Sequence, residues 1–150
     1  MTMQRLQPGA HAFVLDKLSY DFKSLGLLAE ALDTSGISMM PSGETNHRLA
    51  LVGDKVAALA VSLLWYPTGR PRVHAADALA AQSNPNLARV ANAIGLANVL
   101  VLQGMGPVRA AQSTRMMATA LEALLGAIYL DSGNNLVLIQ SILTDLGLWP

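Results

Sequence analysis

The sequence predicts an all-α fold, and three observations support that class. Apolar residues recur at helical spacing along nearly the whole chain, and no segment shows sustained alternation of apolar and polar residues. Clusters of glycine, proline, serine and asparagine interrupt this pattern where helices would have to end. At 150 residues the chain has the size of one domain, which we expect to span residues 1–150 with a core at about 11–147.

The N-terminal half is predicted to form four helices. Apolar spacing over residues 13–18 and 25–32 indicates two short ones, followed by a break rich in glycine, serine and proline. Asn46 then stands where a side chain can cap a long helix over 49–64. The prolines and glycine that follow this helix stop it, and residues 75–81 supply the fourth.

The C-terminal half is predicted to form three more helices. Residues 83–96 open with cap and proline signals and reach a C-terminal cap at Gly95. Residues 104–107, with the sequence GMGP, indicate a loop. Residues 114–130 form a second long apolar helix, and residues 136–146 form the last.

The composition excludes several classes of protein. The chain is 52% hydrophobic and 13% charged, against about 25% charged in typical domains, so it is not a disordered tail, and a subunit interface is favoured. It has no cysteine, which excludes disulfides, zinc knuckles and cysteine nucleophiles. The longest uncharged run, residues 90–108, contains amide side chains, glycines and a proline, so we expect no membrane span. The N-terminus is not a secretory signal; an intracellular location is expected, with cytoplasm, nucleus and mitochondrion left open.

Charge is distributed unevenly along the chain. The net charge is zero overall, but −2 over residues 1–47, +5 over 48–115 and −3 over 116–150. The middle segment is therefore the part that could face phosphates, and Arg70, Arg72 and Arg109 are the first candidates for RNA contacts. The alternative is that Arg70 and Arg72 only solvate a turn.

Two acids stand in strongly apolar helices. Asp54 lies within the first long helix and Glu122 within the second, where a carboxylate needs a cation, a donor or a metal to compensate for lost hydration. One interpretation is a functional site. The other is a pair of structural salt bridges, with Arg48, Arg89 or Arg115 as the partner.

Four segments resemble the ribonuclease III family. NHRLALVGDKVAAL at 46–59 is similar to its signature helix, and LEALLGAIYLDSG at 121–133 to its second conserved helix. Residues 27–36 and 76–96 resemble two further family segments, and the order and spacing agree over 25–146. The chain is most similar to small single-domain members found in fungi, which lack a double-stranded-RNA-binding domain. The resemblance implies the all-helical nuclease-domain fold, dimerised through the signature helix with itself or a related chain, with double-stranded RNA across the joint face.

The resemblance also implies a site, and two of its acids are missing. The family uses four acids to hold Mg²⁺ or Mn²⁺, which prefer oxygen ligands and activate water. Asp54 and Glu122 match two of them, whereas the other two positions hold Ala50 and Thr119. His47 stands where an acid usually opens the motif. Two anions cannot offset the repulsion between two divalent ions, so we expect hydrolysis to be absent or strongly impaired.

Three functions remain open from the sequence. The first is a dimer that binds or organises double-stranded or structured RNA with little or no cleavage. The second is a compact, metal-dependent endoribonuclease that uses Asp54 and Glu122 as a reduced metal site, with Mg²⁺ or Mn²⁺ as cofactor. The third is a structural interaction module, for example in a mitochondrial large ribosomal subunit.

Overall fold

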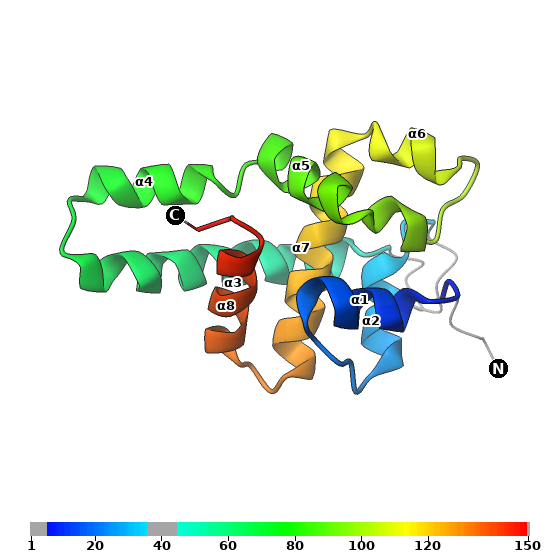
Figure 1. Cartoon of the computed structure of the whole chain (residues 1–150), viewed down its shortest axis with the longest axis horizontal. Coiled ribbons are helices and arrows are strands. Elements are labelled where there is room, and N and C mark those ends of the chain that lie inside the picture. The colour runs from blue at the N-terminus through cyan, green and yellow to red at the C-terminus, as the bar shows by residue number, and fades with distance from the viewer. Residues whose placement is uncertain (1–5, 36–44, 150) are drawn as a thin grey trace.

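A computed structural model describes residues 6–35 and 45–149 and confirms the all-α prediction. Within these residues there is no β-strand, only an isolated bridge between Asp33 and Val101. Figure 1 shows the arrangement of the eight α-helices and two short 3₁₀ helices: α1 (Ala10–Leu18), α2 (Leu25–Leu32), α3 (His47–Trp65), η1 (Tyr66–Thr68), α4 (Arg72–Ala80), α5 (Asn84–Ile94), η2 (Leu96–Val99), α6 (Pro107–Ala111), α7 (Thr114–Asp131) and α8 (Leu136–Asp145).

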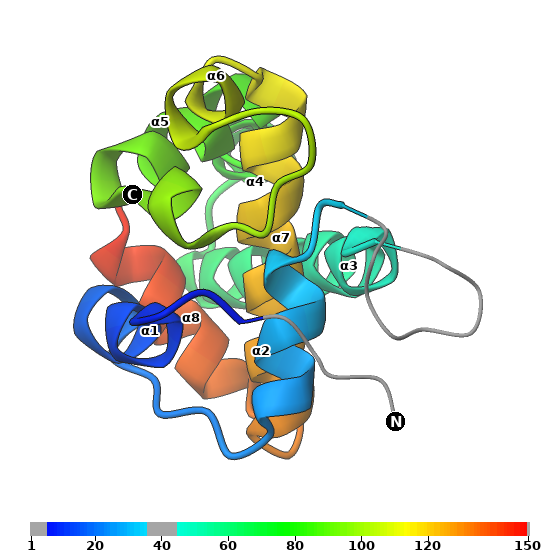
Figure 2. The same cartoon turned by 90° about the vertical axis from the view of Figure 1, so that its right-hand side faces the viewer.

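Helix α7 is the centre of the core. It packs against α2, α3, α5 and α8, and Figure 2 shows it running between the upper and lower groups of helices. Because neighbours surround it, α7 is buried almost all round, which explains why its sequence is apolar on every side. The side chain of Ser113 caps its first turn by accepting a hydrogen bond from the amide of Met116.

The C-terminal end of α7 is tied to the N-terminal part of the chain by one carboxylate. Asp131 accepts hydrogen bonds from the Tyr20 hydroxyl (2.6 Å) and from the backbone amides of Lys23 and Ser24 (both 2.9 Å). Burial alone would raise the pKa of Asp131, but these hydrogen bonds outweigh it and hold the pKa below its usual range. The contact joins residues more than 100 positions apart in sequence and fixes where α2 begins.

The predicted cap at the start of α3 is wrong in its mechanism. Asn46 occupies the capping position, but its side chain makes no capping hydrogen bond. It is buried, and it donates instead to the carbonyl of Ala31 at 3.1 Å, while its backbone amide donates to Asp33 at 2.9 Å. Asn46 therefore fastens the beginning of α3 to the end of α2.

Three other elements differ from the prediction. The helix expected at 13–18 begins earlier, at Ala10, directly after Gly9. The helix expected at 75–81 begins earlier, at Arg72, directly after Pro71. The short helix α6 was not predicted, because a five-residue helix opening with Pro107 is indistinguishable from the loop that precedes it. The end of α5 is as predicted: Gly95 adopts φ 81° and its amide bonds back to Ala91 and Asn92.

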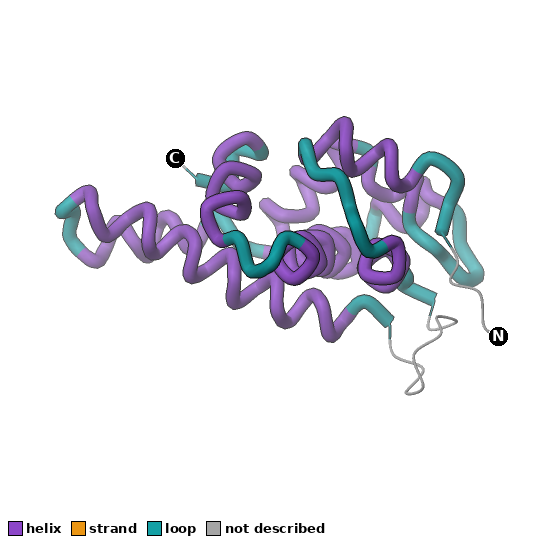
Figure 3. Tube along the Cα trace, turned by 90° about the horizontal axis from the view of Figure 1, so that it is seen from below, coloured by secondary structure: helices purple, strands orange, loops and turns teal. Residues whose placement is uncertain are grey.

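Helix α3 lies at the outer edge of the molecule and keeps one face uncovered. Seen from below, it runs along one side with no other helix beyond it (Figure 3). With η1 it is long and apolar enough to cross a membrane by length and composition alone, with a third of its most apolar window buried. It carries the charged residues Asp54 and Lys55 at mid-length and packs on α7 and α8, as a core helix of a globular domain does.

Candidate functional site

Helices α3 and α7 cross with their backbones in direct contact, and two glycines make this possible. A Cβ atom on Gly53 would stand 1.7 Å from the carbonyl oxygen of Glu122, and one on Gly126 would stand 2.2 Å from the carbonyl oxygen of Leu49. No side chain fits at either point. Gly53 precedes Asp54, and Gly126 lies one turn after Glu122. The glycine contact therefore sets the distance between the two acids.

This crossing brings the sequence-predicted site positions together. A shallow cavity of about 270 Å³, here called the acid cavity, lies beside the crossing. Its walls include all five positions identified from the sequence, together with Leu51 and Arg115: His47, Ala50, Asp54, Thr119 and Glu122. The α3 residues that line it lie at helical spacing on one face, as do those of α7.

The two retained acids interact with each other. Burial, the nearby charge of Asp54 and a hydrogen bond to the Asp54 carboxyl together raise the pKa of Glu122 to about 7, with burial as the largest cause. At neutral pH the carboxyl group of Glu122 is therefore protonated for about half of the time. The carboxylate of Asp54 also pairs with its neighbour Lys55 at 3.3 Å.

The three arginines suggested as salt-bridge partners of Asp54 and Glu122 do not organise this site. Arg48 binds the carboxylate of Glu30 at 3.2 Å, and Arg89 binds the side-chain oxygen of Asn86 at 2.8 Å. Arg115 lines the acid cavity but makes no ion pair with either acid, within the part of the chain that the structure describes.

The donor set does not fit a pair of divalent ions. In residues 6–35 and 45–149, no three histidine, cysteine or acidic side chains come together as metal ligands. The oxygens available are those of Asp54, Glu122 and Thr119, and one of the two carboxyl groups is half protonated at neutral pH. The guanidinium of Arg115 lies in the same wall, where it would repel a cation.

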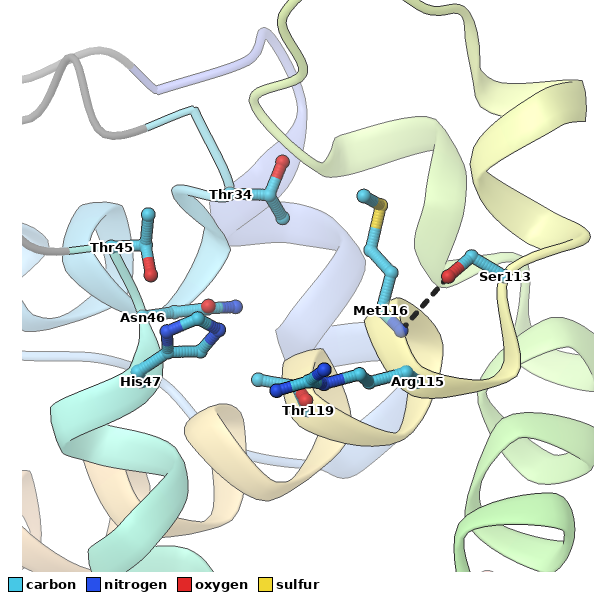
Figure 4. Close-up of a pocket in the computed structure, with 8 residues that line it drawn as sticks. All are labelled: Thr34, Thr45, Asn46, His47, Ser113, Arg115, Met116 and Thr119. Carbon is cyan, nitrogen blue, oxygen red and sulfur yellow. Dashed lines mark hydrogen bonds between the residues drawn. The ribbon is translucent and has the colours of Figure 1, made fainter.

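A second cavity adjoins the first and is lined by polar groups without any acid. It also measures about 270 Å³, and Figure 4 shows the residues around it, which come from the starts of α3 and α7 and from the end of α2: Thr34, Thr45, Asn46, His47, Ser113, Arg115, Met116 and Thr119. It shares His47, Arg115 and Thr119 with the acid cavity. We call it the polar cavity.

The predicted RNA contacts do not form one patch. Arg70 and Arg72 follow the end of α3, whereas Arg109 lies on α6, and these two regions are at opposite ends of the long axis in Figure 1. All three side chains are exposed. Arg70 lines a separate cavity of about 750 Å³ together with His74, Asp77 and the indoles of Trp65 and Trp149.

Sequence reasoning missed the roles of Gly53, Gly126 and Arg115. A glycine inside a helix costs about 1 kcal/mol relative to alanine, so two glycines in the middle of long helices signal a close approach of backbones. That signal was present in LVGD and LLGA. For Arg115, the sequence indicated only a structural salt bridge to one of the two acids.

Replacing Glu122 should change how stability depends on pH. The folded-state pKa of Glu122, about 7, lies above the value of 4.5 for an unperturbed glutamate. The wild-type protein should therefore lose stability as pH rises from about 4.5 through 7, because the unfolded chain releases this proton first. Glu122→Gln should remove this loss and be more stable than wild type at pH 8 by about 1 kcal/mol, a value discounted because the side chain is half-exposed.

The measurement is urea unfolding of both proteins at pH 5, 6, 7 and 8. The two curves should converge at the acidic end, where the wild-type carboxyl is protonated. Asp77→Asn, at an exposed carboxylate on α4, is the control and should leave the pH dependence unchanged. If the free energies of unfolding of wild type and Glu122→Gln run parallel across this pH range, the raised pKa of Glu122 is contradicted.

Comparisons with known proteins agree with this architecture. The ribonuclease-III-like domain family matches residues 34–145. The chain is 35% identical over 129 residues to ribonuclease 3 of Nitrosomonas europaea, covering 82% of this chain and 50% of that protein. It is 36% identical over 127 residues to ribonuclease 3 of Pelotomaculum thermopropionicum, covering 79% and 52%. The chain thus spans about half the length of these curated relatives.

The fold also matches a solved structure. The nuclease domain of ribonuclease III from Campylobacter jejuni superposes with a TM-score of 0.76 at 24% identity, covering 89% of this chain and 93% of that one. That structure is described as having flexibility in a region involved in dimer formation.

Proposed function

This chain belongs to the ribonuclease III family, and on that premise we propose that it binds double-stranded or structured RNA with hydrolysis absent or strongly impaired. The observation that carries the proposal is the acid cavity. Where the family resemblance places four acids, this cavity has Asp54 and Glu122, and alanine and threonine hold the other two positions. A protonated Glu122 leaves little negative charge at neutral pH to attract divalent ions.

RNA binding does not depend on the missing acids. Duplex RNA is recognised mainly through phosphates and 2′-hydroxyl groups across its shape. The segment 48–115 carries a net charge of +5, and its exposed arginines lie at both ends of the domain. Arg70, Arg72 and Arg109 are therefore proposed as phosphate contacts spaced along one duplex, not as a single basic cluster.

A second candidate, a compact endoribonuclease, is favoured by one observation. Asp54 and Glu122 line the same cavity, and Asp54 is near enough to raise the pKa of Glu122, so the two carboxylates could hold a single divalent ion once Glu122 is deprotonated. In that case Mg²⁺ or Mn²⁺ would be the cofactor, and activity would rise with pH through about 7.

One experiment separates the two candidates. Purified protein is incubated with long double-stranded RNA in Mn²⁺, in Mg²⁺ and in chelator, and both the mobility shift and the products are measured. We expect a shift that persists in chelator and weakens as salt increases, with little or no cleavage. Metal-dependent cleavage that Asp54→Asn abolishes would establish the endoribonuclease instead. No shift at any salt concentration would refute RNA binding.

We further propose that a second copy of the chain covers the open face of α3. Three leucines spaced by multiples of four residues lie on that face, namely Leu51, Leu59 and Leu63, exposed by 64%, 50% and 46%. Together with the exposed Tyr66 beyond them, they make an apolar stripe of the kind that marks an interface. Leu51 also lines the acid cavity, so a partner on this stripe would lie beside the site.

Leu59→Glu should weaken self-association. A two-fold dimer places the substitution in the interface twice, and burying an unpaired carboxylate is unfavourable on both sides. We expect the dimer dissociation constant to rise about 30-fold, equivalent to about 2 kcal/mol, as measured by sedimentation equilibrium. The control is Val137→Glu, at a 72%-exposed valine of α8 outside the stripe, which should leave association unchanged. Equal association of both variants would rule out this interface.

A further inference from the structure

The polar cavity has the composition of an anion site. Its lining contains one guanidinium, Arg115, and one imidazole, His47, and no aspartate or glutamate. Four hydroxyl-bearing residues lie on its walls, namely Thr34, Thr45, Ser113 and Thr119. The hydroxyl of Thr34 donates to the carbonyl of Val101, and the other three add further donors. The two remaining acids of the site line the neighbouring cavity and not this one.

Thr34 and Asn46 donate to the carbonyls of Val101 and Ala31, but the other side-chain donors of the cavity are not used by the protein itself. Within the described part of the chain, neither Arg115 nor His47 has a side-chain hydrogen bond or ion pair. The hydroxyl oxygen of Thr45 is buried and has no partner there either. Ser113 accepts a hydrogen bond from the amide of Met116 at 3.2 Å, which leaves its own hydroxyl hydrogen to donate. A buried polar group without a partner is unfavourable, so a ligand that accepts a hydrogen bond from Thr45 would remove that cost. The side chains of His47 and Arg115 are exposed and are free to turn toward a ligand.

The backbone around the polar cavity also favours an anion. Figure 4 shows α3 beginning at His47 and α7 beginning just before Arg115, with the cavity between them. The first amides of a helix carry partial positive charge, and those of α3 receive no side-chain cap because Asn46 binds elsewhere. Both long helices therefore add to the attraction that the guanidinium of Arg115 exerts on an anion.

We propose that the polar cavity binds a phosphate group directly, without a divalent cation. Arg115 would bind two phosphate oxygens in its fork geometry, and His47 and the hydroxyls of Thr45 and Ser113 would donate to the others. A volume of about 270 Å³ exceeds the roughly 30 Å³ that one water takes, so the cavity has room for a phosphate and its first waters. This proposal rests on the proposed function and extends it. With two acids missing from the acid cavity, phosphate would be bound directly in the polar cavity instead of through metal ions.

The ligand could be a free phosphate or a phosphate of an RNA chain, and the experiment has an arm for each. Inorganic phosphate is titrated into the full chain in chelator and followed by side-chain NMR signals of arginine and histidine. Short RNA duplexes with a 5′-phosphate or a 5′-hydroxyl are titrated in the same way. Saturable binding of inorganic phosphate that shifts the His47 ring and an arginine side chain supports the site. Tighter binding of the phosphorylated duplex identifies a terminal RNA phosphate as the source.

Two variants and a matched control make the outcome specific. Arg115→Gln removes the guanidinium, and His47→Glu places a carboxylate in the cavity; each should weaken phosphate binding at least tenfold. Arg89→Gln, at an exposed arginine of α5 that contacts Asn86, should leave it unchanged. Unfolding curves confirm that each variant is folded.

Binding that is equal in wild type and Arg115→Gln, or no saturable binding of either phosphate source, would overturn the proposal. The duplex with a 5′-hydroxyl tests RNA binding alone. If it binds while phosphate does not, the phosphate site fails and the proposed RNA function stands.

Discussion

Restoring the two missing acids should create or greatly increase metal-dependent cleavage of double-stranded RNA. In the double variant Ala50→Glu and Thr119→Asp, four carboxylates would line the acid cavity, at i and i+4 on α3 and at i and i+3 on α7. Both positions line this cavity, so the new carboxylates can extend into it. We expect the cleavage rate in Mn²⁺ to rise at least about a hundredfold, since losing a single transition-state contact typically costs that much.

The control for this experiment is the triple variant that adds Asp54→Asn. It should return cleavage to the wild-type level, because Asp54 is a ligand that the restored site needs. Binding of duplex RNA in chelator should be equal in all three proteins, which separates catalysis from affinity. If the double variant is folded and binds RNA but remains as inactive as wild type, missing ligands are not what limits hydrolysis.

The second large effect is expected at the helix crossing. Alanine normally stabilises a helix by about 1 kcal/mol over glycine, but at Gly53 the sign should reverse. The new methyl group would stand 1.7 Å from the Glu122 carbonyl oxygen, and a backbone atom cannot move aside as a flexible side chain can. We expect Gly53→Ala to lower the free energy of unfolding by at least about 3 kcal/mol, measured by urea denaturation.

Gly106→Ala is the matched control. Gly106 precedes α6, its Cβ position is open to solvent, and its φ of −95° suits any residue. It should change stability by less than about 1 kcal/mol. A Gly53→Ala protein as stable as Gly106→Ala would show that α3 and α7 do not touch backbone to backbone.

Secondary structure could be predicted well because its signals are local. The long helices α3 and α7 were placed to within two residues at each end, since apolar spacing and flanking glycines and prolines mark them. The short helix α6 and the true role of Asn46 were not predictable. Both depend on distant contacts: Asn46 makes its side-chain hydrogen bond to Ala31 of α2, fifteen residues away.

The candidate site was predicted in part. The sequence pointed to Asp54 and Glu122 and to the positions that lack acids, because a resemblance over four segments aligned them. It did not reveal the polar cavity, since Thr45 and Ser113 belong to no motif and become neighbours only when α3 and α7 cross. Nor did it reveal that the predicted arginines lie at opposite ends of the domain.

By itself, the sequence determined the helical class, the position of the long helices, the family and the number of acids available to hold a metal. The helical class and the helices follow from the periodicity of apolar residues, whereas the family and the number of acids follow from the resemblance over four segments. Only the tertiary structure decided that the pKa of Glu122 is raised, that Arg115 and His47 line a cavity without acids, and that one face of α3 stays open. The physical reason is that burial, charge coupling and unused hydrogen-bond donors depend on which residues are neighbours in space. The order of residues along the chain does not specify those neighbours.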